Sequence, residues 1–275
     1  MARTCPPDPD LDSVETARAR APGIASGIAS GIAPGPGPVV ACGRAVRRAF
    51  ARLADAWLPR PCGLCGRALD EDECGACAHC VALLPGRNVP RCPVCALRRA
   101  AGAACACRGD APFEHTLALA DYAPPLDRAI VALKFRGEIA LGRAFAALAA
   151  PMVRAWPAPG PDLVCAVPLS GPRLAARGYN QALAIAAPLA RELGLPLAPA
   201  LLARTRDTVA QSTLELDARA RNLDGAFVAR EAARSRRVLV VDDVMTSGAT
   251  LAAAASALRS AGACHVANLV VARTA

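Results

Sequence analysis

Residues 238–250 constrain the fold of this chain more than any other segment. The run begins with the apolar stretch Val238–Val241 and continues with Asp242 and Asp243, and a short segment with hydroxyls and a glycine, Thr246–Thr250, follows. A short apolar run bounded by polar residues is typical of a strand buried on both faces. A glycine allows close backbone approach to a ligand, and a helix N-terminus favours an anion. The sequence therefore predicts a buried strand, a phosphate-binding turn and a helix in succession.

The residues of this turn differ in their expected tasks. Asp242 and Asp243 would repel a phosphate placed against them and suit a sugar diol one ribose length away. The pattern lacks the Gly-Lys-Ser/Thr of a Walker A loop and the Gly-x-Gly-x-x-Gly of dinucleotide-binding folds. A plain turn whose Asp and Thr side chains only cap the helix is the structural alternative. The residues expected to hold the phosphate are Thr246, Ser247, Gly248, Ala249 and Thr250.

Strand-like and helix-like runs alternate along residues 113–275. This alternation predicts an α/β fold in which helices flank a parallel sheet. Apolar residues make up 54% of the chain but aromatic residues only 3%, so small side chains would let the helices pack closely on the sheet. The expected strands are 116–120, 163–167, 238–241 and 265–271, and the expected helices are 126–133, 139–152, 180–193 and 250–260.

The second expected strand also leads into a segment that suits an anion. Its loop contains Val167, Pro168 and Leu169, and the basic residues Arg173 and Arg177 follow. Guanidinium groups pair well with phosphate oxygens, so both arginines are candidates for binding an anionic ligand. Solvent-exposed basic residues on a loop are the alternative.

A polar and poorly periodic run extends from Arg204 to Phe227 and includes Gln211. It fits a mobile flap that closes over a bound substrate and excludes water. An ordinary surface connection is the alternative, because a long polar loop need not be functional.

Nine of the thirteen cysteines fall between Cys62 and Cys107. Two Cys-x-x-Cys pairs separated by eleven residues can surround one tetrahedral zinc ion. A second set ends in a Cys-x-Cys pair, which is one residue shorter than usual, so a second zinc ion is less strongly indicated. The candidate ligands are Cys62, Cys65, Cys77 and Cys80 in the first set and Cys92, Cys95, Cys105 and Cys107 in the second.

The zinc prediction depends on the compartment. The sequence shows neither a secretory signal nor an uncharged apolar run of about 20 residues. We therefore expect a cytoplasmic chain without a membrane span, where paired cysteines favour zinc over disulfides. A thiol redox function is the alternative, but the pairs lack the strand–motif–helix context of thioredoxin-like proteins.

The remaining segments give the expected domain organisation. Residues 1–40 are of low complexity and we expect them to be disordered. Residues 41–60 predict an amphipathic helix, which would dock on the protein or bind an anionic lipid or nucleic acid. Residues 61–112 predict a double zinc-ribbon-like module. The formal net charge of +9 fits a phosphate-rich partner or a solvated arginine-rich surface.

Together these motifs resemble the ComF family (ComFC/GntX-like proteins). The resemblance covers about residues 58–275 and also includes Leu133-Lys134-Phe135, Arg177-Gly178-Tyr179-Asn180-Gln181 and Arg221-Asn222. It implies a type I phosphoribosyltransferase fold that binds 5-phosphoribosyl-1-pyrophosphate (PRPP) and Mg²⁺. Asp242 and Asp243 would orient the ribose, and Arg173, Arg177 and Lys134 would stabilise the departing pyrophosphate.

The same resemblance implies a biological setting. Family members are associated with natural competence, so single-stranded DNA and a competence helicase are candidate partners. Two functions stay open at this level: a phosphoribosyltransferase with an unknown acceptor, and a non-catalytic PRPP sensor or an adaptor for nucleic acid or a helicase. A shortage of aromatic side chains weakens the case for direct binding of single strands.

Overall fold

The computed structural model describes residues 61–70, 72–73, 75–99, 105, 107, 111–156, 159–205 and 225–274. Residues 61–275 belong to one compact unit. The predictions for residues 1–40 and 41–60, and most of the flap prediction, including Gln211, lie outside the described residues. No helix in the described ranges is long and apolar enough to cross a membrane.

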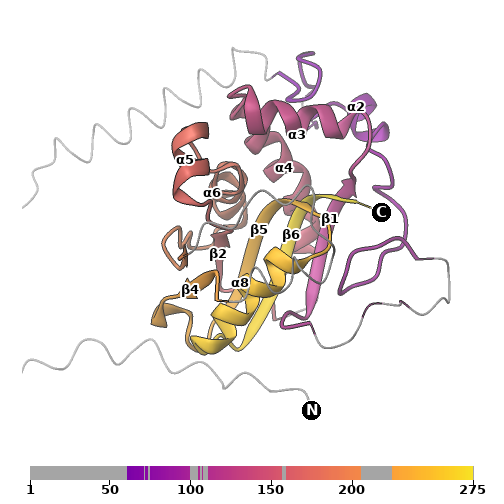
Figure 1. Ribbon diagram of the computed structural model, residues 1–275. Helices are drawn as coiled ribbons and strands as arrows, with labels where there is room; N and C mark the ends of the chain where they lie inside the picture. The colour runs from indigo at the N-terminus through magenta and orange to yellow at the C-terminus, as the bar shows by residue number, and fades with distance from the viewer. Residues whose placement is uncertain are drawn as a thin grey trace, which may run out of the picture. The chain divides into compact units, whose positions relative to one another are not determined.

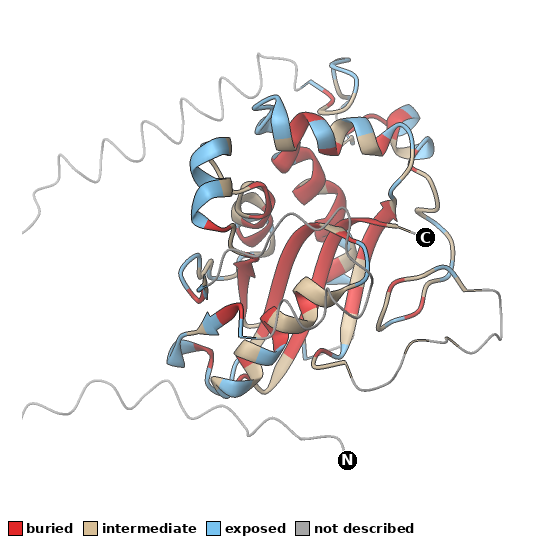
Figure 2. Cartoon of the chain, in the orientation of Figure 1, coloured by how far each residue is buried: buried red, intermediate tan, exposed pale blue. Residues whose placement is uncertain are grey.

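A parallel four-stranded sheet forms the centre of the fold (Figure 1). Its order is β1 (His115–Asp121), β6 (His265–Arg273), β5 (Arg237–Met245) and β2 (Leu163–Ala166). The two inner strands, β6 and β5, are buried along most of their length (Figure 2), as expected for strands covered on both faces. All four expected strands are therefore confirmed.

Helices cover both faces of this sheet. One core cluster joins α3 (Leu126–Phe135), α4 (Ala140–Arg154) and α6 (Gln181–Leu193) to the sheet, and a second joins α8 (Ala249–Ser260), which lies over the other face (Figure 1). Alternate residues of β5 supply the two clusters, because successive side chains of a strand point to opposite faces. The four expected helices are confirmed to within two residues at each end.

Other elements were not expected from the sequence. A short helix, α5 (Gly171–Arg177), occupies the segment interpreted as a loop. The strands β3 (Leu202–Arg204) and β4 (Phe227–Ala229) pair antiparallel, although a long stretch of chain separates them. Short helical turns form α2 (Ala78–Ala82) and η1 (Glu231–Ala233). Such short elements carry too few residues to show a period and depend on tertiary contacts.

The cysteine-rich segment packs on the α/β unit in two places. Its second half covers the edge strand β1, where the amide of Thr116 donates to the carbonyl of Pro93 over 2.7 Å. An edge strand has unpaired backbone groups, and this contact satisfies one of them. Its first half lies against α4, where a Cβ at Gly75 would come within 3.0 Å of the Cα of Ala144. Both halves are thus held by contacts with the sheet or its helices.

Candidate functional site

The turn between β5 and α8 has the form expected of a phosphate-binding loop. Gly248 caps α8 with φ 83°, a left-handed conformation that glycine adopts without strain. A Cβ at this position would also lie 2.6 Å from Cε of Met245. The side chains of Thr246 and Ser247 are exposed, and the first turn of α8 begins directly afterwards at Ala249. The amide of Ala249 donates to the hydroxyl oxygen of Ser247 over 3.4 Å, so the later amides of that turn and the two hydroxyls are available to an anion.

The two acidic residues lie inside β5, which runs on to Met245 instead of ending at Val241. Asp242 pairs in register with Val270 of β6. The Oδ2 atom of Asp243 lies 2.8 Å from Nζ of Lys134 in α3. This ion pair places Asp243 beside α3, and the charge of Lys134 also acts on the neighbouring Asp242. The two carboxyl groups are close enough to interact, because, in addition to burial, both the charge of Asp243 and a hydrogen bond with its side chain raise the pKa of Asp242.

The negative charge of the two acids beside the loop is smaller than that of two free carboxylates. Burial raises the pKa of Asp242 well above its ordinary value, and the nearby charge of Asp243 raises it further. The amide of Asp243 donates to Oδ1 of Asp242 over 2.9 Å, which partly opposes this effect. Lys134 compensates the charge of Asp243, whose side chain is only 5% exposed. A phosphate at the turn therefore meets less repulsion than two free carboxylates would cause.

The segment Val167–Leu169 lies at the same edge of the sheet. The amide of Val167 donates to the carbonyl of Val241 over 3.0 Å, so this segment begins beside the carboxyl half of β5. Nδ2 of Asn180 donates to the carbonyl of Val167 over 2.9 Å, while its Oδ1 accepts from the amides of Ala182 and Leu183 and caps α6. Asn180 thus fixes this loop to a helix. In open α/β sheets, ligands bind beyond the carboxyl ends of the strands, where both loops meet.

Arg173 and Arg177 lie one helical turn apart on α5. Both are half-buried, and a spacing of four places them on the same side of the helix. The guanidinium of Arg177 donates to Gln181 and stands 5.0 Å from the ring centroid of Phe135. Phe135 follows Lys134 at the end of α3 and is 71% exposed. The structure thus brings Arg177 next to the segment that carries Lys134.

Three further residues position the site and were not singled out for this role from the sequence. Asn180 caps a helix, and its place before the apolar period of α6 is a recognisable signal. The hydroxyl of Tyr179 donates to the carbonyl of Leu133, which joins this motif to α3. Arg273 at the end of β6 contacts the carbonyls of Met245 and Thr246, and no local pattern in the sequence indicates this contact.

The eight paired cysteines form two groups, each with four sulfur atoms within 4.8 Å of one another. A tetrahedral zinc site with Zn–S bonds of about 2.3 Å needs sulfur atoms separated by about 3.8 Å. The Sγ atoms of Cys65 and Cys77 are 3.7 Å apart, and those of Cys92 and Cys107 are 3.5 Å apart. Both sulfur atoms of the short pair Cys105 and Cys107 therefore lie within the second group. The spacing of the sulfur atoms in each group fits a zinc ion.

Backbone hydrogen bonds favour the thiolate of Cys77 in the first group and of Cys92 in the second, whereas burial raises the pKa of Cys80 and Cys95. The pKa of Cys77 is lowered to about 6, chiefly by a hydrogen bond from the backbone of Cys80. Burial alone would raise the pKa of Cys92, but hydrogen bonds from the backbone of Cys95 and Val94 lower it to about 6. Zinc binds the thiolate, so this backbone geometry suits a metal site.

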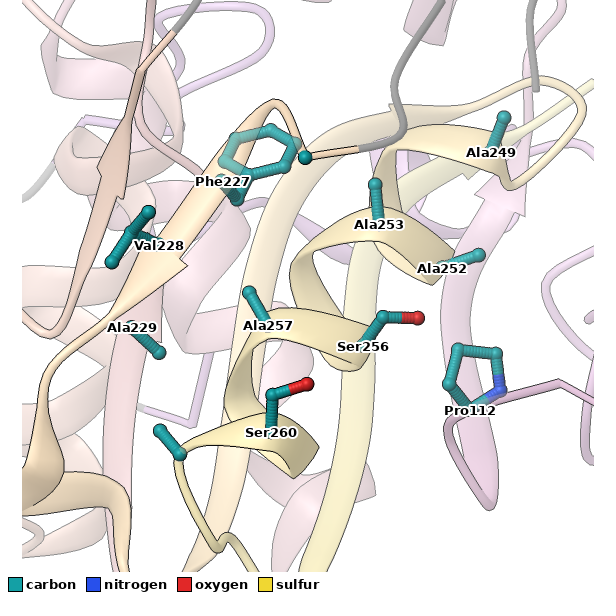
Figure 3. A pocket seen from close by; sticks show the side chains of 12 residues that line it. Pro112, Phe227, Val228, Ala229, Ala249, Ala252, Ala253, Ser256, Ala257 and Ser260 are labelled. Carbon is teal, nitrogen blue, oxygen red and sulfur yellow. The ribbon is translucent and has the colours of Figure 1, made fainter. Parts of the chain in front are cut away.

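A separate groove of about 610 Å³ runs along the outer side of α8 (Figure 3). Small side chains of α8 line it on one side, including Ala253 and Ala257, and Phe227 and Val228 of β4 line it on the other. It touches the phosphate loop only at Ala249. The groove contains none of the acidic or basic residues of the site and is not part of it.

Comparisons with known proteins identify a matching family model and several relatives. Residues 180–275 match the family model described as the phosphoribosyl transferase domain. The chain is 33% identical over 225 residues to the DNA utilization protein YhgH of Salmonella typhi, covering 79% of this chain and 98% of the relative. It is 32% identical over 157 residues to Competence protein F of Haemophilus influenzae, covering 54% and 69% of the two chains. A solved adenine phosphoribosyltransferase from Leishmania tarentolae aligns with a TM-score of 0.35 and 13% identity, over 58% of this chain and 91% of that one.

Proposed function

Because this chain belongs to the ComF family and has a type I phosphoribosyltransferase fold, we propose that it binds PRPP with Mg²⁺ at the carboxyl end of β5. The observation that carries the proposal is the turn at Gly248, which leaves helix amides and two hydroxyls open to a phosphate. The turn follows directly on two acids suited to sugar hydroxyls, and a phosphoribosyl group contains both kinds of partner.

Each part of the ligand has a matching part of the site. Residues 246–250 would hold the 5-phosphate through backbone amides and hydroxyls. Asp242 and Asp243 would accept hydrogen bonds from the ribose hydroxyls. The amides of 167–169 and the guanidinium groups of Arg173 and Arg177 would hold the pyrophosphate. Mg²⁺, when bound with the ligand, would neutralise part of the pyrophosphate charge.

The proposed reaction is phosphoribosyl transfer. The bond from C1 to the pyrophosphate oxygen breaks with its electron pair, which leaves on pyrophosphate, and a lone pair of the acceptor forms the new bond to C1. The acceptor loses its proton to solvent. This route needs no nucleophilic side chain, so the chain contributes by positioning the ligand and stabilising the developing charges. Lys134 beside Asp243 and the two arginines of α5 are cations near this edge that could serve the leaving group.

Calorimetry with PRPP and Mg²⁺ tests the proposal. We expect saturable binding by the wild-type protein, and a loss of at least about tenfold in Gly248→Ala because a side chain strains this backbone. Gly160→Ala is the matched control, since a Cβ there meets nothing within 4 Å. Absence of heat from the wild-type protein, or equal binding by both variants, would refute the proposal.

A second candidate is an adaptor that binds single-stranded DNA or a helicase partner. The exposed Phe135 with Arg177 beside its ring is a surface on which a base can stack, and the net charge of +9 favours a polyanion. The name of the relative YhgH also refers to DNA utilization. A gel-shift titration separates the candidates: an adaptor predicts salt-sensitive binding that survives Asp242→Asn and Asp243→Asn but weakens in Phe135→Ala.

We also propose that each cysteine group holds one structural zinc ion and that the protein works in the cytoplasm, where the thiols stay reduced. Four thiolate ligands close the coordination shell, so these sites would support folding and not catalysis. Elemental analysis should find two zinc ions per chain and one in Cys105→Ser. A wild-type protein without zinc would overturn this part.

A further inference from the structure

Arg273 occupies an unusual place for an arginine. It is the last residue of β6, it is only 6% exposed, and its guanidinium makes hydrogen bonds in two directions. A buried guanidinium is costly unless carbonyl or carboxylate oxygens satisfy it. No carboxylate pairs with Arg273 within the described ranges, and its partners there are backbone carbonyls and the Thr274 hydroxyl.

One direction leads to the second cysteine group. Nε of Arg273 donates to the carbonyl of Cys95 over 2.8 Å. The Sγ of Cys95 is one of the four sulfur atoms of this group and lies 3.3 Å from that of Cys105. Arg91 holds the same turn, because it donates to the carbonyl of Ala96 over 3.1 Å and pairs with Asp121 over 2.8 Å. The backbone that carries the sulfur is therefore fixed to the carboxyl ends of β1 and β6.

The other direction leads to the phosphate loop. Nη1 of Arg273 donates to the carbonyl of Met245 over 3.2 Å and to the carbonyl of Thr246. In a trans peptide, the carbonyl and the following N–H point in opposite directions. Holding the Thr246 carbonyl toward Arg273 therefore turns the amide of Ser247 away from it. This fixes the direction of one of the amides at the entry of the loop.

The first cysteine group differs in this respect. It packs on α4, where Gly63 and Gly75 approach Ala144, and the amide of Gly63 donates to the carbonyl of Gly75 over 2.9 Å. Its nearest elements belong to the face of the sheet opposite α8. Only the second group is linked to the loop through one side chain among the described contacts.

We propose that Arg273 is a positioning residue that couples the second cysteine group to the phosphate loop, so that metal binding at Cys92, Cys95, Cys105 and Cys107 orders the loop. Loading of this group would then raise the affinity for a phosphoribosyl ligand, whereas the first group would serve folding alone. The affinity part of this inference rests on the proposed function, but the ordering of the loop does not.

The test uses the full-length protein and two readouts. Hydrogen exchange of the peptide that spans 245–250 reports loop order without any ligand, and calorimetry with PRPP and Mg²⁺ reports affinity. We expect Arg273→Met to speed exchange in this peptide and to weaken affinity, each by about tenfold, the size expected when a charge-assisted hydrogen bond is lost. Arg273→Lys keeps the charge, but one ammonium group cannot bond the carbonyls of Cys95 and Thr246 together. Its exchange rate and its affinity should therefore lie between those of wild type and Arg273→Met.

The metal dependence is tested with a matched pair of cysteine variants. Cys105→Ser should speed exchange in the loop peptide about as much as Arg273→Met, and Cys65→Ser should not. The double variant Cys105→Ser/Arg273→Met should be no worse than either single variant, because both remove the same link. Zinc content and circular dichroism confirm that each variant keeps its fold and its other metal.

The outcomes separate this inference from the proposed function. If wild-type protein does not bind PRPP, the proposed function fails, while the exchange data still decide whether the link exists. If Cys65→Ser and Cys105→Ser speed loop exchange equally, or if the double variant is additive, Arg273 does not couple the group to the loop. Either result would overturn the inference.

Discussion

At the scale of single residues, the site depends on how burial and charge are combined at two neighbouring acids. Asp243 is compensated by Lys134, whereas Asp242 is buried and has a raised pKa. The sequence identifies both acids as polar residues at the end of an apolar run. Their different environments follow from burial and from α3, whose Lys134 pairs directly with Asp243 and acts on Asp242 only through its charge.

Asp242→Asn should change how stability depends on pH. A folded pKa raised above the unfolded value means that the folded protein keeps a proton which the unfolded chain releases, so stability falls as pH rises above about 4. The amide cannot ionise, and the variant should therefore gain thermal stability relative to wild type as pH rises. Melting temperatures from pH 4 to 8 in the absence of ligand measure this, and Asp70→Asn at an exposed carboxyl is the control. Parallel curves for wild type and Asp242→Asn would show that Asp242 is ionised in the folded state.

Lys134→Met should destabilise the protein because it leaves the Asp243 carboxylate buried without a compensating cation. Removing one partner of a buried ion pair typically costs about 3 kcal/mol or more. Urea denaturation measures the loss, and the double variant Lys134→Met/Asp243→Asn should recover most of it. Equal stabilities of the single and double variants would mean that the pair contributes no coupling.

At the scale of elements, helix termini organise the site. The phosphate loop ends at the first turn of α8, and the loop at 167–169 is held to the first turn of α6 by Asn180. Both helices were expected from the sequence, but the capping role of Asn180 was not. The short helix α5 was not expected, because it buries no residue and its sequence shows no apolar period.

Asn180→Ala should lose both the cap of α6 and the bond to Val167. We expect a loss of about 1 kcal/mol in unfolding free energy, typical of a removed N-cap, together with weaker PRPP binding. Asn180→Asp separates the two roles, since its carboxylate still caps the helix but cannot donate to the carbonyl of Val167. Chemical denaturation and calorimetry on both variants give the measurement. Intact ligand affinity in Asn180→Asp would show that the bond to Val167 does not position the loop.

At the scale of the whole molecule, the cysteine-rich segment and the sheet belong to one compact unit. The second half of that segment covers the edge of β1 and satisfies the amides of Thr116 and Asp121 through the carbonyls of Pro93 and Pro85. A metal-free segment would lose the turns that hold these carbonyls, so the effect of the metal should reach the α/β core.

Chelation of zinc should therefore lower the melting temperature of the whole unit and not only unfold residues 61–107. We expect one cooperative transition at a lower temperature, and faster hydrogen exchange in β1 after treatment with a strong chelator, because its edge amides lose their acceptors. Differential scanning calorimetry and exchange of the peptide covering 115–121 measure the two effects, and zinc added back should reverse both. Unchanged exchange in β1 would show that the segment is energetically independent of the sheet.

The sequence by itself determined the elements whose signals are local. The apolar runs of the four strands, the periods of α3, α4, α6 and α8, the glycine turn at 248 and the spacing of the cysteine pairs are all properties of neighbouring residues. The cysteine spacing also indicated two groups of four. The shortened Cys105–Cys107 pair made the prediction of the second group less certain, and the structure shows that its four sulfur atoms do lie together.

Only the tertiary structure decided which distant residues meet. The pairing of β3 with β4, the contact of Lys134 with Asp243 and the link from Cys95 through Arg273 to Thr246 join segments that are far apart in the chain. No periodicity records such contacts, because they are selected by the packing of the whole core and by the need to satisfy buried polar groups. The residues that carry the chemistry could therefore be identified from short stretches of sequence. Their charge states, and the contacts that hold them in place, depend on segments that only the tertiary structure brings together.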